Sequence, residues 1–171
     1  MKNIYLLFFF LIFSSFAYGQ EKIVYIDINY LLTQSEVGKQ INSKLKKIND
    51  INVKEFKKIE LNIKSSEEKL LKQKNILKKE DYEIKVSELK SKYKSYQAQR
   101  IKKNDELNQL RNKAGGEILK HINEILTKYS KNESISLIIE KKNVVIGKTD
   151  LDVTSDILSL LDKKIKKIEL Q

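Results

Sequence analysis

Apolar residues alternate between two faces near the start of the chain. Residues 23–28 are apolar except for Asp27, and β-branched and aromatic side chains dominate. We therefore expect a β-strand, with one face formed by Val24, Ile26 and Ile28. Asp27 is expected to cap the turn that follows. Residues 29–34 can form a short helix, and Ser35 is placed to cap a longer helix after it.

From residue 41 the apolar spacing changes to alternating steps of three and four. This heptad spacing is typical of helices that pack along a narrow seam. No Pro and only one Gly occur between residues 36 and 114, so nothing in the sequence breaks the helices from within. One step, around Phe56, is off by a residue. The heptad pattern is interrupted near residues 77–83, which divides it into two runs. The first run is Ile41, Leu45, Ile48, Asn52, Ile59, Ile63, Ser66, Leu70, Gln73 and Leu77. The second run is Tyr82, Val86, Leu89, Tyr93, Tyr96, Arg100, Lys103, Leu107, Leu110 and Ala114.

Two heptad helices separated by a polar turn are expected to fold back on each other. Residues 41–114 therefore predict an antiparallel, coiled-coil-like hairpin arm with its tip near residues 78–81. Pairing about this turn places Tyr96 opposite Ile63 and Leu107 opposite Asn52. At ~1.5 Å per residue the arm is about 55 Å long. Polar residues interrupt the seam and are expected to let the arm flex; they are Asn52, Gln73, Arg100 and Lys103.

Gly115 and Gly116 stand where the seam changes phase, before Ile118. Paired glycines are known sites of helix kinks. We interpret the pair as a hinge where the arm meets the rest of the molecule; a local irregularity without a role is the alternative.

The C-terminal part predicts the rest of a small body. Residues 135–140 and 144–147 read as strands joined by a hairpin-length connection, residues 141–143. A last helix is expected next, with Thr154 as its N-cap. The body would comprise residues 20–40 and 115–171, giving an α+β fold. Because a small sheet leaves open edges, we expect it to pair with other chains. The predicted body and oligomer core consists of Val24, Ile26, Ile28, Ile135, Leu137, Ile139, Val144 and Ile146.

The first nineteen residues predict export. Lys2 precedes an apolar run over residues 4–13, and Ala17 and Gly19 provide small residues just before Gln20. This order is typical of a cleaved secretory signal peptide, and the run is shorter than the roughly 20 residues of a membrane span. The absence of Cys excludes a lipoprotein anchor at this site.

Charge is concentrated in the predicted arm. Residues 36–131 contain 25 Lys or Arg and 14 Asp or Glu, a net charge of +11, whereas the rest of the mature chain has a net charge of −1. A basic arm is expected to attract acidic proteins and to make at most weak, non-specific contacts with anionic membrane lipid. Almost all of the basic residues are Lys, which lacks the planar fork suited to specific base readout. Together with export and the lack of a reader fold, this argues against a nucleic-acid partner.

Candidate catalytic chemistry is missing from the sequence. There is no Cys, one His (His121) and no phosphate-binding Gly loop. A single His without Cys or a second His does not make a zinc site. We therefore expect no enzyme activity, no cofactor and no metal, and interpret His121 as a packed or solvated helix residue.

Four segments together resemble the Skp/OmpH family of periplasmic chaperones. They are "KIVYIDINYLLTQSEVGK" (22–39), "EDYEIKVSELK" (80–90), "ISLIIEKKNVVIG" (135–147) and "DVTSDILSLL" (152–161). The resemblance implies a homotrimer whose body is a small β-barrel and whose three arms enclose a cavity. It also implies an ATP-independent periplasmic holdase for unfolded outer-membrane proteins.

Client contact would then lie on the arms, and the resemblance carries over no catalytic residue. Apolar residues off the main seam are the candidates, with ordinary packing inside the hairpin as the alternative: Val53, Phe56, Leu61, Leu71, Ile76, Ile84 and Ile101. A structural coiled-coil envelope protein without client binding is the competing hypothesis. It would have a continuous seam and no terminal sheet.

Overall fold

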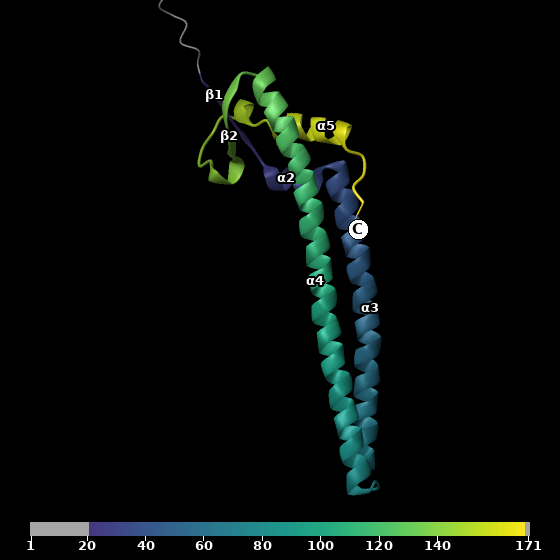
Figure 1. Ribbon diagram of the computed structural model, residues 1–171. Coiled ribbons are helices and arrows are strands. Elements are labelled where there is room, and N and C mark those ends of the chain that lie inside the picture. Colours follow the sequence, from purple (N-terminus) through teal and green to yellow (C-terminus); the bar gives the residue numbers. More distant parts are fainter. Residues whose placement is uncertain (1–20, 170–171) are drawn as a thin grey trace, which may run out of the picture.

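The computed structural model, which describes residues 21–169, is a long two-helix arm projecting from a small body (Figure 1). The predicted signal peptide lies outside the described residues. At ~1.5 Å per residue, the two arm helices are about 57 and 81 Å long. In chain order the elements are β1 (Lys22–Ile26), α2 (Ile28–Gln34), α3 (Glu36–Gln73), α4 (Lys79–Asn132), β2 (Ile135–Glu140), short 3₁₀ turns at Lys141–Asn143 and Thr149–Leu151, and α5 (Thr154–Lys164).

Side-chain caps start the first two helices. The Asp27 carboxylate accepts a hydrogen bond from the Tyr30 backbone N–H at 2.8 Å. The Ser35 hydroxyl oxygen accepts one from the Gly38 backbone N–H at 3.1 Å and is fully buried. Each cap satisfies a donor that the first helical turn leaves free, so both caps predicted from the sequence are confirmed.

The arm matches the predicted seam closely. α3 and α4 lie side by side along their length (Figure 1), and every predicted seam residue of α3 is buried or half-buried except Gln73. The tip is residues 74–78, a few residues earlier than expected. Glu80 and Asp81 belong to the first turn of α4, where acidic side chains interact favourably with the helix dipole.

The predicted C-terminal β-hairpin is wrong. β1 and β2 pair in parallel, with Val24 opposite Ile138 and Tyr25 opposite Ile139, and residues 144–147 form no strand. The other edge of β1 is occupied instead by a bridge between Tyr25 and Asp152. The Val153 N–H donates to the Tyr25 carbonyl oxygen at 3.0 Å. Both edges of β1 are therefore used within one chain.

Residues 144–147 cross Tyr25 as a loop. A Cβ on Gly147 would lie 2.9 Å from Cε1 of the Tyr25 ring, so the backbone passes close over it. Ile146 is 92% exposed and Val145 is fully exposed, which leaves their side chains without packing partners in the described chain. The short apolar run at residues 144–146 indicated a strand, but the position beside β1 that a strand would need is taken by Asp152.

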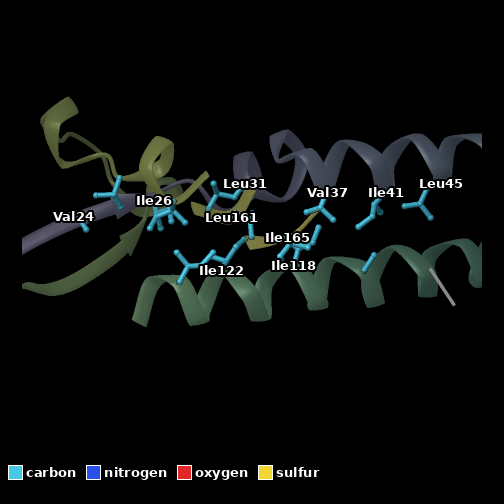
Figure 2. Close-up of a cluster of buried hydrophobic side chains, with 14 of the residues drawn as sticks. Val24, Ile26, Leu31, Val37, Ile41, Leu45, Ile118, Ile122, Leu161 and Ile165 are labelled. Carbon is cyan, nitrogen blue, oxygen red and sulfur yellow. The ribbon is translucent and has the colours of Figure 1, made fainter. Parts of the chain in front are cut away.

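One hydrophobic core joins the body to the base of the arm. It extends from Val24 and Ile26 of β1 through Leu31 of α2 to Ile122 and Ile118 of α4 (Figure 2). It continues along the arm to Leu45 and Leu107 and stops there; farther out, the fully packed apolar residues are Leu70 and Tyr96. The base of the arm is therefore anchored in a core, whereas its outer part is packed only along a thin seam.

Candidate functional site

A network of polar contacts closes the body around β1. Asp152 accepts hydrogen bonds from the Lys141 ammonium group at 2.8 Å and from the Thr154 N–H at 3.0 Å, and it also contacts the Thr154 hydroxyl group. The Thr154 hydroxyl oxygen accepts from the Asp27 N–H at 2.9 Å. Burial opposes ionisation of Asp152, but hydrogen bonds from Lys141 and Thr154 outweigh it and keep the pKa of its carboxyl group below the usual value.

The middle of the arm contains an open groove between α3 and α4. Its volume is about 670 Å³. Seam positions that would normally hold Leu are polar here: Asn52 is half-buried, and Arg100 and Lys103 are exposed. Because these side chains do not fill the seam, the helices leave a hollow between them. Its apolar surface is provided by Val53, Phe56, Ile101 and Leu107.

Phe56, Tyr96 and Arg100 pack against one another beside this groove. Phe56 packs edge-on against Tyr96, with ring centroids 6.0 Å apart. The Arg100 guanidinium carbon lies 5.6 Å from the centroid of the Tyr96 ring, and its Nη1 lies 3.4 Å from the Tyr96 hydroxyl oxygen. This geometry is favourable for a cation–π contact. It holds Arg100 against the arm at the edge of the groove.

The candidate client-binding residues are mostly exposed. Phe56 is the exception, because it is half-buried against Tyr96. Three of the seven candidates, Val53, Phe56 and Ile101, line the same groove. The others are exposed at separate points on the arm: Leu61, Leu71, Ile76 and Ile84.

The predicted body residues fall into two groups in the single chain. Val24 and Ile26 are fully buried, and Ile28, Ile135, Ile139 and Val144 are half-buried. Leu137 on β2 is 50% exposed, and Ile146 is almost fully exposed. The inward-facing side of β1 is therefore complete within one chain, whereas Leu137 and Ile146 face outward.

The predicted hinge lies inside a continuous helix. α4 runs through Gly115 and Gly116 without a break, and a Cβ at either position would touch nothing within 4 Å. Neighbouring Ala114 and Ile118 are both buried in the core. α4 is thus continuous at the point where the sequence suggested a bend, and the hinge stays a prediction.

Several residues of the groove and of the body network carry no signal in the sequence. Asn49, Gln97 and Asn104 line the groove but lie off the heptad seam, so only the register of the two helices brings them together. Lys141 and Asp152 meet through a loop that was expected to be a strand. The polar residues Asn52 and Arg100 in the heptad seam were the one feature of the sequence that pointed to this region, and both line the groove.

His121 is the single His of the sequence and lies on α4. His121 Nδ1 is buried without a hydrogen-bond partner, 3.7 Å from Glu124 Oε2. Across residues 21–169, no group of three His, Cys, Asp or Glu side chains is arranged to hold a metal ion. Among the helices of this same range, none is long and apolar enough to cross a membrane.

Comparisons with known proteins agree on the fold. A crystal structure of an OmpH-like protein from Caulobacter crescentus CB15 superposes with a TM-score of 0.78, at 17% identity, over 88% of this chain and 89% of that one. The search of curated proteins gave no match. The family model described as "Outer membrane protein (OmpH-like)" matches residues 22–161. Since this match spans most of the sequence, the chain belongs to the OmpH/Skp-like family of outer membrane protein chaperones, which are not enzymes.

Proposed function

We propose that this protein is an ATP-independent periplasmic holdase that binds unfolded outer-membrane proteins between its arms and prevents their aggregation. The observation that carries the proposal is the arm itself. It projects from the body with a net charge of +11 and exposes large apolar side chains along its length. A packed structural coiled coil has no need of such side chains on its surface.

The chemistry of the arm suits an unfolded acidic chain. Exposed Val and Ile side chains offer apolar contacts without a deep pocket, so that many different sequences can bind weakly at several points. Lys residues between them attract acidic segments over long range and speed the encounter. Multiple weak contacts on one client add up to strong retention because each further contact is intramolecular.

The active form we propose is a homotrimer with a shared β-barrel. Within the described residues, β2 pairs only with β1, so its outer edge is free. Leu137, Val145 and Ile146 expose apolar side chains nearby. Open edges with apolar side chains favour pairing with another chain. Three copies would place three arms around one axis and enclose a cavity.

A light-scattering assay tests the holdase activity. The mature protein is mixed with a urea-unfolded outer-membrane barrel protein, and scattering is followed after dilution of the urea. We expect a threefold excess of chain to suppress aggregation without ATP. Unchanged aggregation would refute the holdase and favour the structural envelope alternative. Sedimentation of the free protein tests the trimer separately, and a stable monomer would refute it.

A further inference from the structure

The groove in the middle of the arm has a chemistry different from that of the surrounding surface. Four side-chain amides surround its apolar floor: Asn49, Asn52, Gln97 and Asn104. No hydrogen bond links any of these four side chains to another residue of the described chain. An amide side chain offers both a donor and an acceptor, which is the same pair that a peptide backbone presents. The groove is therefore suited to an extended peptide.

Arg100 adds a free positive charge at the edge of the groove. Its guanidinium group contacts Tyr96 but makes no ion pair with any carboxylate in the described chain. Lys103, the other basic seam residue, is already paired with Glu106 at 2.9 Å. A planar guanidinium group binds a carboxylate with two parallel hydrogen bonds. Arg100 is thus the available partner for an acidic side chain.

We propose that this groove binds short extended peptide segments in which Asp or Glu alternates with apolar residues. Apolar side chains on the peptide face turned into the groove would contact Val53, Phe56 and Ile101, and the backbone would bind the amides. A carboxylate on the outward face would bind Arg100, which is exposed at the edge of the groove. In an extended chain, residues i and i+2 lie on one face about 7 Å apart. A volume of about 670 Å³ accommodates a few such residues. The inference rests on the proposed holdase function and names the client segments that one site prefers.

Two labelled peptides test the charge preference. One is a nine-residue peptide of alternating Val and polar residues that include two Glu; the other has Gln in place of both Glu. Fluorescence anisotropy at low salt gives their affinities. We expect the wild-type protein to bind the Glu peptide at least threefold more tightly than the Gln peptide. Arg100→Gln should abolish this preference. The control Arg111→Gln should keep it, because Arg111 lies outside the groove and contacts Asn108.

A second pair of variants tests the apolar floor. Ile101 lines the groove and is 65% exposed, whereas Ile51 is 56% exposed and does not line it. Ile101→Ser should weaken both peptides at least threefold, and Ile51→Ser should leave both affinities within twofold of the wild type. Since both side chains are on the surface, neither change is expected to unfold the arm.

The results separate this inference from the proposed function. The same protein samples are also tested with the full-length unfolded client by light scattering. If the client is protected but neither peptide binds, or the wild type shows no preference for Glu, the groove assignment is wrong while the holdase stands. Equal effects of Ile101→Ser and Ile51→Ser would also overturn it. If neither peptide nor client binds, both proposals fail.

Discussion

Single residues fix the junction between the body and the arm. Ser35 and Asp27 cap two successive helices, and both roles could be predicted because a cap and its partner lie within three residues of each other. Thr154 was expected to cap the last helix, but its hydroxyl oxygen accepts from the Asp27 N–H. That contact could not be predicted, since the two residues lie 127 positions apart and meet only in the folded body.

Gly38 should be intolerant of any side chain. A Cβ at this position would lie 2.2 Å from the Leu32 carbonyl oxygen, which belongs to the backbone and cannot move aside. We expect Gly38→Ala to lower the free energy of unfolding by about 1–3 kcal/mol, as overpacking usually does. Urea unfolding followed by circular dichroism measures the change.

Gly116 provides the matched control. A Cβ there would touch nothing within 4 Å, and Ala is the better helix former by roughly 0.8–1.0 kcal/mol. Gly116→Ala should therefore leave stability unchanged or raise it. A Gly38→Ala protein as stable as the wild type would contradict the close packing of α2 against α3.

Tyr129 should make stability depend on pH in the alkaline range. Desolvation and the hydrogen bond to Asp156, 2.8 Å long, raise its pKa to about 12 from an ordinary value of 10.0. Between pH 10 and 12 the unfolded chain loses this proton while the folded chain keeps it. The stabilisation is therefore complete below pH 10 and is lost as pH rises toward 12.

The variant Tyr129→Phe isolates this contribution. Its urea midpoint should fall less than that of the wild type between pH 9.5 and pH 11.5, since the many Lys residues titrate in both proteins. Parallel loss of stability in the two proteins would show that the Tyr129–Asp156 contact does not form.

At the scale of elements, the heptad arm could be predicted in detail because helix periodicity is local and long. The C-terminal hairpin could not, because a short apolar run such as residues 144–146 looks the same whether or not a neighbouring strand edge is free. Residues 144–147 look like a strand but pass over Tyr25, and Asp152 takes the place beside β1. The groove could be predicted only in part. Its polar seam residues could be identified from the sequence, but the side-chain amides off the seam line it only because of the register between the two helices.

The end of α5 and the tail that follows it should act together as a structural clamp. Ile165 is only 7% exposed and belongs to the core. Lys166 pairs with Glu36 of α3, and Lys164 pairs with Glu124 of α4. Exposed ion pairs contribute little, so the apolar contact should dominate. This clamp, residues 164–169, lies beyond the segment matched by the family model, which ends at residue 161.

Ile165→Ala tests this clamp. We expect it to cost about 2–5 kcal/mol, the range for truncating a buried Ile, and to lower the melting temperature measured by calorimetry. Ile76→Ala at the exposed tip should have almost no effect. Equal melting temperatures for the two variants would place Ile165 outside the core.

Stability should also fall along the arm from base to tip. The core ends at Leu45 and Leu107, and beyond it only a thin seam packs the two helices. Local opening needs less free energy where fewer apolar contacts are broken. Hydrogen exchange should therefore be slow near residues 37–45 and 107–122 and faster over residues 50–100. Uniformly strong protection would contradict a flexible outer arm.

At the scale of the whole molecule, the body and the arm differ in packing and in charge. The body and the base of the arm share one apolar core (Figure 2), while the arm carries the net charge of +11. This division could be predicted from the sequence, since charge and heptad segments coincide. The oligomer depends on a surface between chains, for which a single sequence contains only the hint of exposed apolar residues such as Leu137 and Ile146.

Site-specific photo-crosslinking tests most directly that clients are held by the arms. A photoreactive amino acid replaces either Leu71 on the arm or Leu160 on the body, both exposed, and each protein is mixed with an unfolded outer-membrane barrel protein and irradiated. We predict strong crosslinks to the client from position 71 and few from position 160. Equal crosslinking at both positions, or stronger crosslinking from the body, would contradict the account.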